Sequence, residues 1–104
     1  MTREQKRPLI RKLYIDSQGV KRGYYVYVHK DRATGTVFYV GKGSGKRAYD
    51  TNSRSPRWWE RVRSLSEGWD VEIVGQDMSE LEAFALEAEL VDRHREAEVE
   101  GKEI

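Results

Sequence analysis

Apolar and polar side chains alternate with a period of two in two neighbouring stretches, and this pattern predicts strands over residues 23–30 and 37–41. In the first stretch, valines occupy one side of the expected strand. The other side carries Tyr25, Tyr27 and His29. Because this alternation is typical of half-buried strands, we expect the valine side to be buried and the aromatic side to be open.

The second strand and its connection complete a predicted hairpin. Phe38 and Val40 are expected on one side of this strand, and Tyr39 and Gly41 on the other. The intervening Thr34-Gly35-Thr36 suits a hairpin turn. An antiparallel hairpin would place tyrosines from both strands on one face, beside a glycine that lets a phosphate group approach the backbone.

Local signals predict two longer helices and a third strand. Ser55-Pro56 fits a helix start, with serine as the N-cap and proline at the first helical position, and this helix should continue to about Ser66. Alternation predicts a strand over residues 69–73. Ser79 to Glu82 fits a capping box that opens the longest helix. The expected buried stripe of the first helix comprises Trp58, Val62 and Leu65. That of the longest helix comprises Leu81, Phe84, Ala85, Ala88 and Val91.

The rest of the chain carries weaker patterns. Residues 1–22 form a basic extension, in which residues 8–15 have helix-like spacing. A short helix is expected over residues 46–50, and residues 96–104 form an acidic tail. The sequence therefore predicts one α/β (α+β) domain over residues 23–95, with a small three-stranded antiparallel sheet flanked by helices.

Composition fits one small domain with a modest core, since 38% of the 104 residues are hydrophobic and 36% are charged. The net charge of +1 hides a strong division. Residues 1–63 contain 16 Lys and Arg against 5 Asp and Glu, whereas residues 64–104 contain 3 against 13. A basic half can follow a phosphate backbone by displacing its counterions, and this favours a nucleic-acid partner. The acidic half can supply metal-binding carboxylates or remain solvated.

The sequence also disfavours several kinds of site and location. It has no cysteine, which excludes disulfides and thiolate zinc sites, and its two histidines are too few for a histidine-based metal site. No apolar run approaches the roughly 20 residues that a membrane span needs. No signal peptide is visible, so we expect a cytoplasmic protein without a membrane partner.

The hairpin and the longest helix together resemble the GIY-YIG nuclease superfamily over about two thirds of the chain. Tyr25-Val26-Tyr27 takes the place of the GIY motif, and Tyr39-Val40-Gly41 that of the YIG motif. Lys42 matches the Gly-Lys of the excision-repair branch. Arg47 matches the arginine on the following helix, although the interval before it is shorter than in several branches. Glu87 matches the metal-binding glutamate on a later helix.

This resemblance implies a metal-dependent endonuclease that hydrolyses DNA phosphodiester bonds. Tyr27 would be the general base, and Glu87 would hold one Mg²⁺ or Mn²⁺ ion. The arginine and lysine would stabilise the charge of the phosphate. The expected catalytic residues are Tyr27, Tyr39, Lys42, Arg47 and His29. The expected nucleic-acid contacts are Gly41, Gly43, Lys46, Arg54, Arg57 and Arg61.

The sequence is also compatible with other interpretations. The chain could be a catalytically inactive nucleic-acid-binding module of the same fold, or an interaction domain whose basic and acidic halves pair between molecules. The tyrosines could be ordinary cross-strand aromatics, and His29 could make a structural hydrogen bond. Trp58 and Trp59 are more typical of a core than of base-stacking platforms. The preferred DNA (duplex, single-stranded or branched) and the choice between monomer and weak homodimer are also open.

Overall fold

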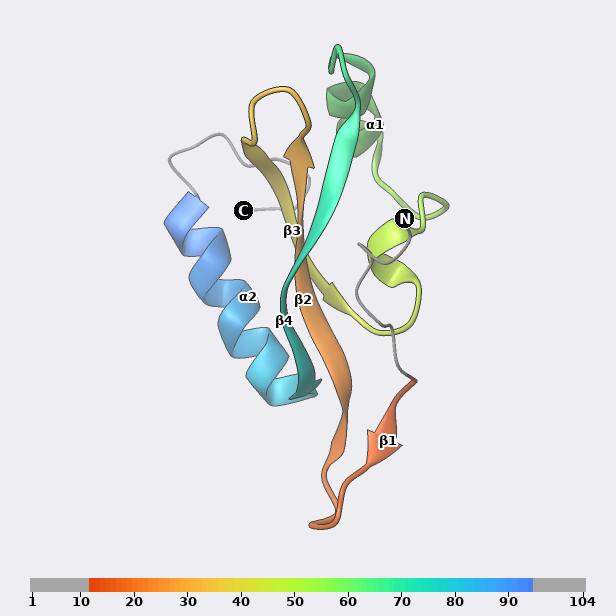
Figure 1. Cartoon of the computed structure of the whole chain (residues 1–104), viewed down its shortest axis with the longest axis vertical. Coiled ribbons are helices and arrows are strands. Elements are labelled where there is room, and N and C mark those ends of the chain that lie inside the picture. Colours follow the sequence, from red (N-terminus) through yellow and green to blue (C-terminus); the bar gives the residue numbers. More distant parts are fainter. Residues whose placement is uncertain (1–11, 95–104) are drawn as a thin grey trace, which may run out of the picture.

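A computed structural model describes residues 12–94 as an antiparallel sheet with helices on both sides (Figure 1). The elements in chain order are β1 (Tyr14–Ile15), β2 (Lys21–Asp31), β3 (Val37–Gly43), the 3₁₀ helix η2 (Arg47–Tyr49), α1 (Pro56–Arg63), β4 (Trp69–Ser79) and α2 (Glu80–His94). The long strand β2 is central. It pairs with β4 on one side, and with β3 and the short β1 on the other. The predicted α+β class is confirmed, with four strands rather than three.

The N-terminal part of the chain differs from its prediction. The expected helix over residues 8–15 is wrong where it is described, because Tyr14–Ile15 is a strand. The Asp16 side chain accepts hydrogen bonds from the backbone N–H groups of Gln18 and Val20, at 2.8 and 2.9 Å, and this turns the chain into β2. Residues 8–11 and the acidic tail at 96–104 lie outside the described residues.

Helix α2 covers the valine face of the sheet. Val26, Val28 and Val40 form a buried cluster with Ala83 and Leu90 of this helix. Of the predicted stripe of α2, Val91 packs against this cluster. The rest of the stripe was wrong, as shown by the exposed fractions of Leu81 (77%) and Phe84 (56%). The residues of α2 that are buried are Ala83, Glu87 and Leu90. Apolar residues lie around most of this helix, so their spacing alone does not fix which side faces the sheet.

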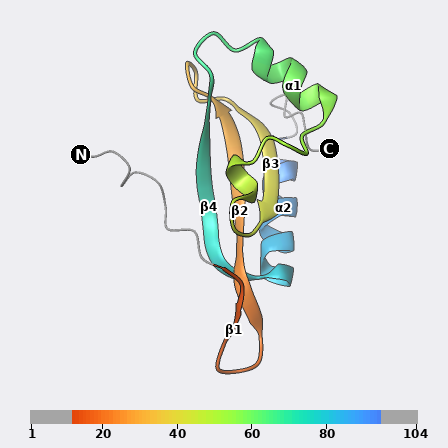
Figure 2. The same ribbon diagram turned by 90° about the vertical axis from the view of Figure 1, so that its right-hand side faces the viewer.

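The opposite face of the sheet is covered by η2 and α1, and Figure 2 shows η2 in front of the sheet with α2 behind it. Tyr25, Tyr27 and Ala48 form a second buried cluster there. Trp58, on the predicted stripe of α1, is also buried. The aromatic face is therefore not open as expected: residues that follow the hairpin in sequence fold back over it.

A β-bulge changes the predicted faces of β3. The register between β2 and β3 shifts at His29 and Lys30, so Val37 pairs with Lys30 and Phe38 is the extra residue. Val37 then packs against the valine cluster. The Phe38 ring instead lies 6.1 Å from the His29 ring. The prediction that Phe38 shares a face with Val40 was wrong, because a bulge breaks the period of two.

Both predicted helix starts are confirmed. Ser55 Oγ accepts a hydrogen bond from the Trp58 N–H at 3.2 Å, with Pro56 in the first turn of α1. Ser79 Oγ accepts from the Glu82 N–H at 3.1 Å, and Glu82 Oε1 accepts from the Ser79 N–H at 3.0 Å. Helix α1 ends at Arg63, slightly before its expected end, and β4 continues well beyond its expected end.

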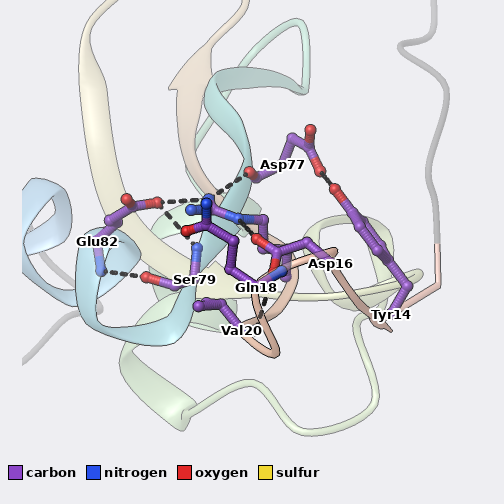
Figure 3. Close-up of polar contacts among 8 residues, drawn as sticks. Tyr14, Asp16, Gln18, Val20, Asp77, Ser79 and Glu82 are labelled. Atoms are coloured by element: carbon purple, nitrogen blue, oxygen red, sulfur yellow. Dashed lines mark hydrogen bonds and ion pairs between the residues drawn. The ribbon is translucent and has the colours of Figure 1, made fainter.

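The capping box also joins a polar network at the end of the sheet (Figure 3). Arg22 contacts Asp16 at 2.8 Å and Glu82 at 2.9 Å, and the Tyr14 hydroxyl donates to Asp77 at 2.5 Å. These contacts connect the β1–β2 hairpin to the junction of β4 and α2. They hold the short strand β1 in place although it contributes little buried surface.

No helix within residues 12–94 is long and apolar enough to cross a membrane.

Candidate functional site

The two tyrosines of the paired motifs do share one face of the sheet. Tyr27 lies opposite Gly41, and His29 lies opposite Tyr39. The Tyr39 ring centroid is 6.1 Å from that of Tyr27 and 5.1 Å from that of His29. Only 1% of Tyr27 is exposed, whereas Tyr39 is half-buried. Tyr39 is therefore the phenol of this pair that a substrate can reach.

Gly41 gives space to a tyrosine rather than to a phosphate. A methyl group added at Gly41 would lie 2.5 Å from the Tyr27 hydroxyl oxygen and 2.6 Å from the adjacent ring carbon. Gly41 is itself buried. The expectation that this glycine contacts nucleic acid is replaced by a packing requirement: a side chain here would collide with Tyr27.

Arg54 occupies the centre of the aromatic face. Its guanidinium donates to the Tyr27 hydroxyl at 3.0 Å and to the backbone carbonyls of Arg47 at 2.7 Å and Asp50 at 2.9 Å. It also lies 5.1 Å from the centroid of the Tyr39 ring. Only 8% of Arg54 is exposed, so it does not lie on an open nucleic-acid-binding surface as expected.

The charge of Arg54 is held by neutral groups. Its guanidinium donates to one phenol and two carbonyls, and within residues 12–94 no carboxylate forms an ion pair with it. Its positive charge can therefore interact with an anionic ligand that approaches the aromatic face. Periodicity could not reveal this position, because Arg54 lies in the loop before the α1 N-cap.

Burial and the neighbouring Tyr39 raise the pKa of Tyr27 to about 12, although Arg54 acts in the opposite direction. At pH 7 this leaves about one phenolate in 10⁵ molecules. In this structure Tyr27 is thus a poor candidate for a general base. Its hydroxyl instead holds the Arg54 guanidinium in place.

His29 has both ring nitrogens occupied in the core. Nε2 lies 2.8 Å from the Ala48 carbonyl oxygen and must carry the proton, and Nδ1 accepts from the Trp58 Nε1–H at 2.9 Å. Burial lowers the pKa of His29 to about 3. His29 is fully buried, so the structure gives it a packing and hydrogen-bonding role in place of the expected catalytic one.

Glu87 and Tyr27 lie in different layers. Glu87 is buried on α2, between Ala83 and Leu90, both of which pack on the valine face. The Tyr27 ring lies on the opposite face. The structure does not bring this carboxylate and this phenol together across the sheet.

Lys42 and Arg47 also lie on different sides of β3. Lys42 pairs with Val26 and therefore points to the side of α2, where its Nζ lies 3.6 Å from Glu80 Oε2. It borders a hollow with Glu80, Leu81 and Phe84 of α2. Arg47 begins η2 on the other side. A methyl group added at Gly43 would lie 2.6 Å from Arg47 Cγ, so Gly43 makes room for the Arg47 side chain.

Three other expected nucleic-acid contacts lie outside the core. Lys46 and Arg57 are exposed. Arg61 is half-buried, with its guanidinium 5.5 Å from the centroid of the Phe38 ring. These side chains belong to η2 and α1 or lie next to them, on the aromatic side of the sheet. Of the three, Lys46 and Arg57 are the side chains that a ligand can reach without displacing a ring contact.

A metal ion here would have few protein ligands. Within residues 12–94 there is no cluster of three or more His, Cys, Asp or Glu side chains that could hold one. Mg²⁺ and Mn²⁺ accept one carboxylate when waters and phosphate oxygens complete the coordination. Glu87 therefore fits such an ion only as a single ligand, with substrate providing the others.

Comparison with known proteins gives no relative: no family model, no curated protein and no solved structure matches this chain.

Proposed function

We propose that this chain is a metal-dependent DNA endonuclease whose site lies along the outer edge of β3. The observation that carries the proposal is the position of β3 between two layers. On its outer side β3 pairs with no strand of the described residues, so groups from both layers can meet there. The groups that would have to meet at this edge are Tyr39 and Lys42 of β3, Arg47, which begins η2, and Glu87 of α2.

In this proposal Tyr39 replaces Tyr27 as the phenol that contacts the phosphate or the attacking water. Tyr39 is half-buried and lies against the Arg54 guanidinium, whose charge favours negative charge nearby. Tyr27 keeps its proton and positions Arg54. The division of roles follows from exposure, because the two phenols share one face and only one of them is accessible.

Charge on the scissile phosphate would be offset from both sides of β3. Arg47 can donate two hydrogen bonds to non-bridging oxygens, and Lys42 can contribute a second positive charge. Glu87 would hold one divalent cation together with water and phosphate oxygens. When bound, such an ion supplies charge neutralisation and a more acidic water.

Cleavage of plasmid and single-stranded DNA, with Mg²⁺, with Mn²⁺ and with chelator, tests the proposal. Glu87→Gln keeps the size of the side chain and should slow cleavage by about 10³-fold or more, because a bound cation supplies several kcal/mol. DNA affinity should persist in this variant. Glu89→Gln is the matched control, since Glu89 is exposed on the same helix and forms an ion pair with Arg93 at 2.8 Å. Cleavage by Glu87→Gln at the rate of the unmodified chain would refute the proposal.

A non-catalytic nucleic-acid-binding module of the same architecture is the second candidate. The observation that favours it is the burial of Tyr27, together with the separation of Tyr27 from Glu87. The same assay separates the two candidates. Metal-independent DNA binding without any cleavage, on every DNA structure offered, would select the binding module.

A further inference from the structure

Trp59 presents part of its indole to solvent on a basic helix. Its exposed fraction is 38%, whereas the adjacent Trp58 is fully buried. Helix α1 contains Arg57, Arg61 and Arg63 but only one acidic residue, Glu60. Arg63 lies one helical turn beyond Trp59, on the same side of the helix, and is exposed.

The indole of Trp59 is held by a rigid support. Its ring meets that of Trp58 edge-to-face, with centroids 5.0 Å apart and planes at 89°. Trp58 is in turn fixed by the hydrogen bond from its Nε1–H to His29 Nδ1. A ring that is already ordered loses little conformational freedom when it contacts a ligand.

Trp58 also lies between Trp59 and the proposed site. The Arg54 guanidinium lies 5.7 Å from the Trp58 ring centroid and 5.1 Å from that of Tyr39. Trp59 is therefore separated from Tyr39 by one ring and one guanidinium group. A strand that contacts Tyr39 through a phosphate would reach Trp59 by continuing past Arg54 and Trp58.

Charge distinguishes Trp59 from the other exposed aromatic ring on a helix. Phe84 is 56% exposed on α2, but its helix carries Glu80, Glu82 and Glu89. A polyanion is repelled from that surface and attracted to α1. An aromatic face beside arginines suits a nucleobase, because bases stack on aromatic rings while their phosphates pair with the basic side chains.

We infer that Trp59 stacks on an unpaired nucleobase, so that the preferred substrate has single-stranded nucleotides next to the cleaved bond. This inference rests on the proposed function and names its substrate class. Bases inside a duplex are already stacked on each other and offer no free face. An unpaired base in a single strand, flap or branch offers a free face, and only such a base would be stabilised by stacking on Trp59.

Binding measurements in the presence of chelator test this without cleavage. The probes are a labelled oligothymidylate, the same strand with abasic sites in place of its bases, and a blunt duplex of equal length. Trp59→Leu should weaken binding of the oligothymidylate by about 5- to 150-fold, the loss expected for one stacked base. Duplex affinity should change by less than about twofold, since phosphate contacts dominate it. Abasic sites should weaken binding to the unmodified chain to a similar degree.

Two control variants accompany this test. Phe84→Leu removes a more exposed ring from the acidic helix and should leave all affinities unchanged. Arg63→Ala should weaken single-strand and duplex binding alike and reduce their salt dependence. Equal effects of Trp59→Leu on strand and duplex, or no effect, would overturn the inference, as would a Trp59-dependent self-association without any base dependence.

These experiments distinguish failure of the Trp59 stacking site from failure of the nuclease proposal. Trp59-dependent binding of the base-containing strand without any cleavage supports the stacking site and refutes the nuclease. Metal-dependent cleavage that is lost in Glu87→Gln but unaffected by Trp59→Leu on every probe refutes the stacking site alone. If Trp59→Leu does not fold, the comparison of abasic and base-containing strands on the unmodified chain still decides.

Discussion

Mild acid is expected to destabilise this domain through a single buried imidazole. His29 carries its proton on Nε2, which donates to the Ala48 carbonyl, and its Nδ1 accepts from the Trp58 indole N–H. A second proton would have to be placed on Nδ1, directly opposite that N–H donor, in a site with no solvent contact. Both effects disfavour the charged form, and burial lowers the pKa of His29 to about 3.

The direction and size of this pH effect follow from the linkage between proton binding and folding. Below its ordinary pKa of 6.5, the imidazole takes up a proton in the unfolded chain but not in the folded one, so stability falls as the pH falls from 6.5 toward 3. Between pH 7.5 and pH 5 this costs about 2 kcal/mol. Asp16 and Glu82 have lowered pKa values, so they lose their stabilising effect only in stronger acid. The range above pH 5 therefore isolates the imidazole.

Urea unfolding at pH 7.5 and pH 5 measures this effect. A loss of about 2 kcal/mol should lower the urea midpoint by about 1 to 2 M at constant slope. The chain has two histidines, so His94→Gln is the natural control and should retain the pH dependence. His29→Gln should lose it. A midpoint for the unmodified chain that stays constant from pH 7.5 to 5, or an NMR titration of His29 near pH 6.5, would refute the reasoning.

Two further predictions concern packing and capping. Gly41→Ala should lower the free energy of unfolding by about 1–3 kcal/mol in urea unfolding, because the new methyl group would collide with the Tyr27 hydroxyl in the core; unchanged stability would show that the Tyr27 ring can move aside. Ser79→Ala should cost about 1 kcal/mol in the same assay, since the Glu82 N–H loses its acceptor. Ser53→Ala, at an exposed loop position, should be neutral, and an equal loss in both serine variants would contradict the capping argument.

Local sequence signals were sufficient to predict most of the helices and strands. The alternation in β2 and the caps at Ser55 and Ser79 depend on neighbouring residues only, and each was predicted from the sequence. The side of α2 that faces the sheet was not, because this helix has apolar residues around most of its surface. Phe38 was assigned to the wrong face because the bulge between β2 and β3 leaves no mark in the alternation.

The candidate site could be predicted only in part. Alternation correctly placed Tyr27 and Tyr39 on the same face, since it reports which side a residue takes. It does not report what covers that side. The covering groups come from η2, from α1 and from the loop that carries Arg54, all of which follow the hairpin in sequence. The burial of Tyr27 and His29 is therefore a tertiary effect that no local pattern contains.

The fold explains part of the charge division in the sequence. Several of the basic residues in the first half form ion pairs with acidic residues of β4 and α2 in the second half. These ion pairs are Arg22–Glu82, Lys30–Glu72, Arg32–Asp70 and Lys42–Glu80. None of the four involves a residue of η2, α1 or the loop between them. Lys46, Arg57 and Arg63 lie beside or within η2 and α1, are exposed and take part in none of these four pairs, so positive charge remains on that side of the domain. Part of the basic half is thus a structural partner for the acidic half, and the proposed nucleic-acid site would use basic residues outside these pairs.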